Sequence, residues 1–207
     1  MRTRVKICGI TKKKDALFAS NLGVDALGFV FYKDSPRYID PIDAGKIISC
    51  LHPFVLRVGL FVNNDAAFVR DSIIKSKINF LQFHGDESEE YCNQFNLPYI
   101  KAISMKEDIN LLECCNNYKS ASALLLDTFS KKLKGGTGTV FDWKKIPRNL
   151  GLRLIIAGGL NSENIISLIK TVKHFCVDVS GGVESRKVVK DEKKMKDFMI
   201  GVNDATL

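Results

Sequence analysis

Eight short apolar runs recur along the whole chain, and they constrain its fold more than any other feature. The runs are nearly continuous in apolar residues instead of alternating, as is typical of strands that are buried on both faces of a parallel sheet. They span residues 5–10, 25–31, 56–62, 79–85, 98–104, 123–128, 153–160 and 176–182. Each run is therefore predicted to form a strand.

The segments between these runs have helical periodicity. Gly23 follows the first helical segment as a C-cap signal, and Pro41 stands in the first turn of the second. Strand and helix alternate eight times at about 26 residues per unit, which predicts a (β/α)8 TIM barrel. No linker divides the chain, so we expect a single α/β domain over residues 1–207. The alternative is an open doubly wound sheet, which needs no eighth strand and binds ligands at a switch point.

The charge balance points to an anionic ligand. The 207 residues carry a formal net charge of +8, which favours either an anionic substrate or nucleic acid. The basic clusters lack interleaved aromatic residues and any nucleic-acid signature, so we expect a small phosphorylated or carboxylated substrate and no nucleic acid. No apolar run approaches the ~20 residues of a membrane span, and the N-terminus is not a secretory signal. We therefore expect a cytoplasmic protein without a membrane partner, and the sequence identifies no protein partner.

Six cysteines raise the question of disulfides or metal. Cys114 and Cys115 are adjacent, no CxxC pair is present, and the three histidines show no metal-ligand spacing to the cysteines. We expect free thiols in a reducing compartment and no metal site.

Two titratable residues end apolar runs on the side where such barrels carry their active sites. Cys8 is either a small buried hydrophobe or a catalytic group. Asp127 closes the apolar run "ALLLD", where a carboxylate either caps the next loop or serves catalysis. A thiolate and a carboxyl group across one barrel mouth would make a base and acid pair, so both are catalytic candidates.

Further polar residues lie near the end of the fourth run and in the loop after the second. His84 is either a second acid or a core histidine with both nitrogens satisfied. Gln82 lies two residues before it, and both are expected to contact the substrate. Arg37, in the loop "KDSPR", is either a surface charge or the partner of a substrate carboxylate.

Glycines lie at or near the ends of the seventh and eighth runs, and further glycines lie in the loop after the sixth run. Each glycine group alone would indicate a tight turn, but three groups on adjacent loops of one barrel favour a phosphate site built from backbone N–H groups. The predicted phosphate-binding residues are Gly135, Gly136, Gly138, Gly158, Gly159, Ser180, Gly181 and Gly182.

Taken in order, several of these segments carry a family resemblance. The sequence resembles the phosphoribosylanthranilate isomerase family of tryptophan biosynthesis from residue 6 to about residue 184. The motifs are "KICGIT" (6–11), "LQFHGDE" (81–87), "LLLDT" (124–128), "GGTGTVFDW" (135–143), "IIAGGLN" (155–161) and "VDVSGGVE" (177–184). Gly181 departs from the family pattern, which has serine there, and the tail lacks the usual glycine before the pair Lys190 and Asp191.

The resemblance implies an Amadori rearrangement without metal or organic cofactor, catalysed by an aldose–ketose isomerase, an intramolecular oxidoreductase. It implies that Asp127 is the general acid, that Cys8 is the general base, and that Arg37 meets the anthranilate carboxylate. One alternative is another phosphosugar barrel enzyme, but the dual-substrate isomerase of histidine and tryptophan synthesis would use paired aspartates in place of Cys8. The other alternative is a non-catalytic phosphate-binding barrel or an RNA-binding protein.

Overall fold

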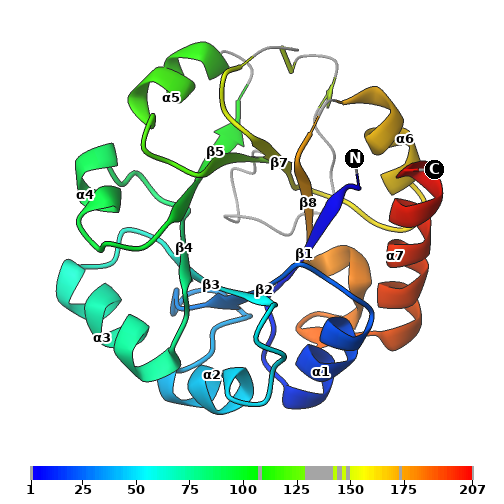
Figure 1. The fold of residues 1–207 in the computed structure, drawn as a ribbon, viewed down its shortest axis with the longest axis horizontal. Coiled ribbons are helices and arrows are strands. Elements are labelled where there is room, and N and C mark those ends of the chain that lie inside the picture. The colour runs from blue at the N-terminus through cyan, green and yellow to red at the C-terminus, as the bar shows by residue number, and fades with distance from the viewer. Residues whose placement is uncertain are drawn as a thin grey trace.

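The structure is a computed structural model that describes residues 2–106, 109–128, 142–143, 146–147, 150–172 and 174–206. Its strands form one closed parallel barrel in chain order, because β8 returns to pair with β1 (Figure 1). The strands are β1 (Arg4–Cys8), β2 (Ala26–Val30), β3 (Leu56–Phe61), β4 (Phe80–Phe83), β5 (Tyr99–Met105), β6 (Ala123–Thr128), β7 (Leu154–Ile156) and β8 (Cys176–Val179). The predicted TIM barrel is confirmed, and the closing pair excludes the open doubly wound sheet.

Helices surround the ring of strands. Pro41 is the first residue of α2, and Asp65 accepts a hydrogen bond from the N–H of Phe68 (2.8 Å) at the start of α3. Gly23 follows α1 with a φ of +82°, the left-handed conformation that favours glycine. The described helices are α1 (Lys13–Asn21), α2 (Pro41–Ile48), α3 (Ala66–Ser76), α4 (Glu89–Asn93), α5 (Leu111–Asn117), α6 (Ile165–Thr171) and α7 (Glu192–Thr206). The helical segment predicted between the sixth and seventh runs, which includes residues 141–149, lies largely outside the described residues.

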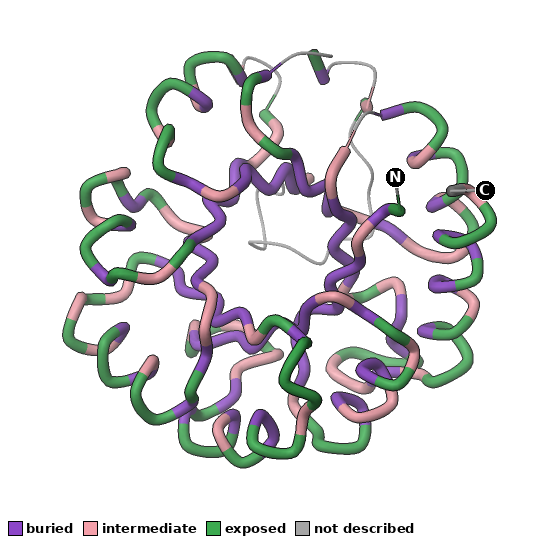
Figure 2. The backbone as a smooth tube through the Cα atoms, viewed as in Figure 1, coloured by how far each residue is buried: buried purple, intermediate pink, exposed green. Residues whose placement is uncertain are grey.

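The strands are buried on both faces, as their continuous apolar runs predict. Figure 2 shows the ring of strands as buried, with the exposed residues on the outer helices and loops. The main core fills the layer between strands and helices. A smaller core fills the barrel and consists of Ile100, Ala102, Ala123, Leu125, Ile155, Ala157 and Cys176. Within the part of the chain that the structure describes, no helix is long and apolar enough to cross a membrane.

A short hairpin after β8 was not predicted from the sequence. Strand β9 (Glu184–Arg186) pairs with β10 (Val189–Lys190) in antiparallel fashion before α7 begins. Strands of two or three residues are too short for an alternating pattern to be recognised. The hairpin affects the site because it carries Glu184 and Lys190.

Candidate active site

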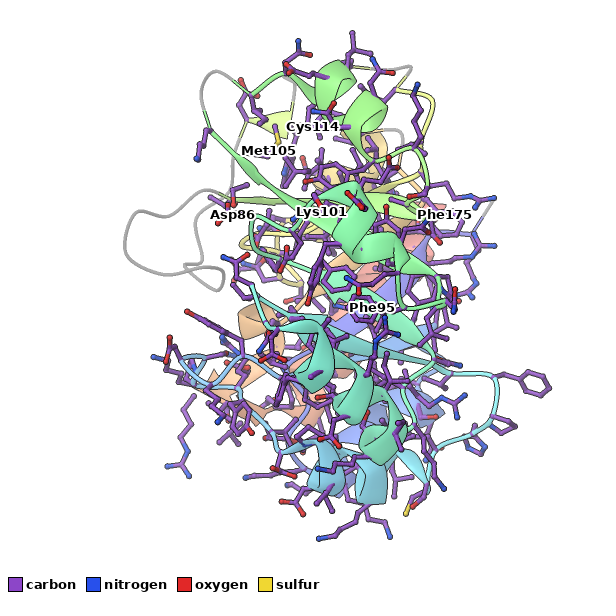
Figure 3. All side chains as sticks on the ribbon, turned by 90° about the vertical axis from the view of Figure 1, so that its left-hand side faces the viewer. Asp86, Phe95, Lys101, Met105, Cys114 and Phe175 are labelled. Carbon is purple, nitrogen blue, oxygen red and sulfur yellow. The ribbon has the colours of Figure 1, made fainter. Side chains whose placement is uncertain are left out.

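The carboxyl ends of the barrel strands meet at one end of the molecule. In the side view of Figure 3, Met105, which ends β5, and Asp86, which follows β4, lie toward one end, and Phe175, which precedes β8, lies toward the other. We call the end with the carboxyl termini the mouth. The residues that the sequence singles out lie at or just beyond these strand ends.

Cys8 is the last residue of β1 and is 6% exposed. Its neighbour across the sheet is Gly28 of β2, and a Cβ built on Gly28 would lie only 2.7 Å from the Cys8 sulfur. Any side chain at position 28 would therefore displace the thiol. Burial raises the pKa of the Cys8 thiol, and the nearby Lys6 ammonium opposes that rise.

An ion pair that the sequence analysis did not select lies inside the barrel. Lys6 of β1 and Asp178 of β8 are register partners, and Lys6 Nζ donates to Asp178 Oδ2 at 2.8 Å. Their side chains are 1% and 7% exposed, respectively. Burial raises the pKa of Asp178 and Lys6 opposes that rise. Burial lowers the pKa of Lys6, but the negative charges of Asp178 and of a Cys8 thiolate outweigh this effect and raise it overall.

Asp127 lies near the end of β6 and is 7% exposed. Its Oδ1 accepts a hydrogen bond from the Thr128 N–H at 2.8 Å. Burial raises the pKa of Asp127 to about 6, and the Thr128 hydrogen bond opposes that rise. Gly158 makes room for this carboxylate, because a Cβ on Gly158 would lie 2.9 Å from Asp127 Oδ1 and the residue has a φ of +82°.

His84 links two of the predicted residues. Its Nε2 lies 3.5 Å from Asp127 Oδ2, and its Nδ1 lies 3.5 Å from Gln82 Nε2. Gln82 is 1% exposed, and its Oε1 has no hydrogen-bond partner among the described residues. The structure thus brings His84 beside Asp127, as a second acid would require. A role for either side chain in substrate binding stays a prediction.

The loops after β7 and β8 are in direct contact. A Cβ on Gly182 would overlap the carbonyl oxygen of Leu160, so these two loops approach backbone to backbone. Gly158 and Gly159 therefore lie near Gly181 and Gly182, as a shared phosphate site requires. Ser180 donates its hydroxyl to the Cys8 carbonyl oxygen at 3.0 Å. The third predicted glycine group, Gly135, Gly136 and Gly138, lies outside the described residues.

Arg37 is held in place by the unpredicted hairpin. Its Nε and Nη2 donate to Glu184 Oε1 and Oε2, both at 2.7 Å. Lys190 donates to the same carboxylate at 2.9 Å and to the Ser180 carbonyl oxygen at 3.0 Å. Burial alone would raise the pKa of Glu184, but Arg37 and Lys190 outweigh it and lower that pKa. No hydrogen bond joins Arg37 Nη1 to another residue in the described ranges.

The residues that sequence reasoning missed share a recognisable signal. Lys6 and Asp178 each interrupt an apolar run, in "VKIC" and "VDVS", and a charge inside a buried strand requires a partner. The pairing itself follows only from barrel closure, which places the first and last strands side by side. Glu184 and Lys190 belong to the short hairpin and carry no comparable signal.

Among the described residues, no group of three or more His, Cys, Asp or Glu side chains is arranged to hold a metal ion. All six cysteines are free.

A closed eight-stranded barrel with buried titratable groups at the carboxyl ends of its strands defines a (β/α)8-barrel enzyme. The family model described as N-(5'phosphoribosyl)anthranilate (PRA) isomerase matches residues 5–200. The chain therefore belongs to the N-(5'-phosphoribosyl)anthranilate isomerase family, which confirms the resemblance found in its motifs.

Individual relatives are similar in sequence to this chain over nearly its whole length. The N-(5'-phosphoribosyl)anthranilate isomerase of Nitrosococcus oceani is 50% identical over 203 residues, or 98% of each chain. The enzyme of that name from Nitrosospira multiformis is 50% identical over 202 residues, or 98% of this chain and 97% of the relative.

Solved structures agree with the fold at the same coverage. The crystal structure of phosphoribosyl anthranilate isomerase from Thermotoga maritima matches with a TM-score of 0.90 and 41% identity, covering 98% of this chain and 99% of the other. A phosphoribosyl anthranilate isomerase in complex with reduced 1-(o-carboxyphenylamino)-1-deoxyribulose 5-phosphate matches with a TM-score of 0.87 and 40% identity, at the same coverage of both chains.

Proposed function

We propose that this chain isomerises N-(5-phosphoribosyl)anthranilate to 1-(2-carboxyphenylamino)-1-deoxyribulose 5-phosphate in tryptophan biosynthesis. The observation that carries the proposal is the position of Cys8 and Asp127 at the carboxyl ends of β1 and β6 in a chain of this family. Six free cysteines, two of them adjacent, are typical of a reducing compartment and support a cytoplasmic location.

The reaction begins with a proton from Asp127. The carboxyl group protonates the furanose ring oxygen, the bond from that oxygen to C1 breaks, and the sugar opens to a Schiff base. A raised pKa supports this role, because it increases the fraction of Asp127 that carries the proton a general acid donates. His84, with Nε2 3.5 Å from Asp127 Oδ2, is placed to return a proton to that carboxylate.

Cys8 completes the reaction as the base. Its thiolate removes the proton from C2, which gives an enolamine that tautomerises to the ketone. C1 is reduced while C2 is oxidised, so the reaction is an internal oxidation and reduction of an aldose to a ketose. The two proton transfers need neither metal nor organic cofactor.

The surroundings of Cys8 suit the rest of the substrate. Cys8, Val30, Leu60 and Val62 form a buried apolar cluster with Tyr32 against it, which suits an aromatic ring. Arg37 lies beside this cluster, since a Cβ on the adjacent Gly9 would contact its side chain, and it is proposed to receive the carboxylate. The adjoining loops after β7 and β8 are proposed to receive the phosphate, which the net charge of +8 attracts.

The activity is tested by the loss of phosphoribosylanthranilate fluorescence with the purified protein. Cys8→Ala and Asp127→Asn should each lower kcat by ~10²–10⁴, the usual effect of losing an acid–base group, with little change in KM. Cys50→Ala is the matched control, because Cys50 is an exposed cysteine outside the barrel. Inorganic phosphate should compete with the substrate. Turnover of Cys8→Ala within a few-fold of the wild type would refute the role of Cys8.

A further inference from the structure

Lys6 and Cys8 point to the same side of β1. Residues two apart on a strand share a face, and both side chains are buried, Lys6 at 1% and Cys8 at 6% exposed. Gly28 shows how closely they converge. A Cβ built on Gly28 would lie 2.7 Å from the Cys8 sulfur and 3.1 Å from Lys6 Nζ. The thiol and the ammonium group thus occupy the space that a side chain at position 28 of β2 would fill.

The ion pair with Asp178 does not by itself explain a lysine at this place. A buried ion pair is usually no more stabilising than well-packed apolar residues, unless all of its hydrogen-bonding groups are satisfied. Asp178 Oδ1 is buried and has no hydrogen-bond partner among the described residues. The pair is therefore costly to keep, and its cation lies beside the Cys8 thiol, because both groups border the space next to Gly28.

Cys8 has two further cations in its neighbourhood. Lys190 and Arg37 interact electrostatically with the thiol, and both are bound to the carboxylate of Glu184. Asp178 opposes ionisation of the thiol, and the buried side chains that cluster with Cys8, Val30, Leu60 and Val62, are apolar. Lys6 has the largest favourable electrostatic effect on a Cys8 thiolate. A base needs the thiolate form, so its supply depends on this lysine.

We propose that Lys6 is the counter-ion of the Cys8 thiolate and that Asp178 holds Lys6 in position below it. Lys6 is thus a positioning residue that acts through Cys8, and this proposal rests on the proposed function. During the reaction the thiolate takes up the C2 proton and becomes neutral, while Lys6 keeps its own proton and its bond to Asp178.

The test measures the ionisation of Cys8 directly. The rate of alkylation of the Cys8 peptide by iodoacetamide is followed by mass spectrometry against pH in the full-length protein. In Lys6→Met the pH at which alkylation of Cys8 is half-maximal, called the Cys8 midpoint, should rise by about one pH unit or more. The kcat should fall about tenfold or more with little change in KM. Lys6→Arg should restore part of both. In Asp178→Asn, which keeps an acceptor for Lys6, the midpoint should fall.

Lys101→Met is the matched control. Lys101 is also a buried strand lysine in an ion pair, with Nζ 3.0 Å from Glu87 Oε2, but it lies on the flank of the barrel between its two ends (Figure 3). Its loss should leave the Cys8 midpoint unchanged. An unchanged midpoint in folded Lys6→Met would overturn the proposal; if that variant does not fold, an unchanged or higher midpoint in Asp178→Asn would do so. Normal turnover of Cys8→Ala would instead refute the proposed function, because the alkylation test does not depend on activity.

Discussion

At the scale of single residues, Asp127 has an environment that favours its neutral form. The residue is 7% exposed, and burial raises the pKa of its carboxyl group from 3.8 to about 6. Between these two values the folded chain binds a proton that the unfolded chain does not, so the free energy of unfolding falls as pH rises through this window. Above pH 6 the folded protein holds a carboxylate that would be more stable in water.

Asp127→Asn should remove this cost. Asn keeps an acceptor for the Thr128 N–H and carries no charge, so its contribution does not change with pH. The difference in free energy of unfolding between variant and wild type should grow by about 2 kcal/mol from pH 4 to pH 7, which is most of the ~3 kcal/mol that corresponds to the full shift from 3.8 to about 6. Urea unfolding at a series of pH values measures this difference. A difference independent of pH would contradict the raised pKa.

The roles of Cys8 and Asp127 could be proposed from the sequence because each ends an apolar run at a predictable end of a strand. The dependence of Cys8 on Lys6 could not, because it arises from the absence of a side chain at Gly28 and from the pairing of β1 with β8. Both are three-dimensional features without a local pattern. Arg37 was expected to face a substrate carboxylate, but its carboxylate partner Glu184 became visible only in the structure.

At the scale of elements, the β9–β10 hairpin contains a strained residue. Val188, in its turn, has a φ of +75°, a region that β-branched residues rarely adopt. Its N–H donates to Glu184 Oε2 at 3.2 Å, so the turn is tied to the residue that holds Arg37. The sequence has valine at this position, where a positive φ favours glycine.

Val188→Gly should stabilise the protein. Glycine adopts this φ without strain, and the relief exceeds the entropy that glycine adds to the unfolded chain, giving a gain of about 1 kcal/mol in the free energy of unfolding. Val189→Gly is the control, because Val189 lies in β10 and glycine weakens a strand. Chemical denaturation of both variants should show opposite signs. A loss of stability in Val188→Gly would contradict the strained turn.

At the scale of the whole molecule, closure of the ring joins the first strand to the last. Four register pairs connect β1 to β8, from Arg4 with Cys176 to Ile7 with Val179. The sequence predicts the eight strands from their apolar runs, but closure is a property of all of them together. We propose on this basis that residues 1–207 form one domain, since no subset of strands is complete without the others.

A chain that ends at Val172 should not fold independently. It lacks β8 and α7, so β1 and β7 would both expose unpaired edges that favour aggregation. Circular dichroism and size-exclusion chromatography should show no cooperative thermal transition and no soluble monomer, in contrast to the full chain. A soluble fragment with a sharp transition would divide the molecule into more than one folding unit.

The hydrogen bonds from Arg37 to Glu184 also affect the entropy of ligand binding. A long side chain that becomes immobile on binding loses rotamer freedom worth about 0.5–1.5 kcal/mol. Arg37 is already fixed by two hydrogen bonds of 2.7 Å, and Glu184 is itself fixed by Lys190. This entropy is therefore lost during folding and not during binding, so a carboxylate that reaches Arg37 meets a guanidinium group whose direction is already set.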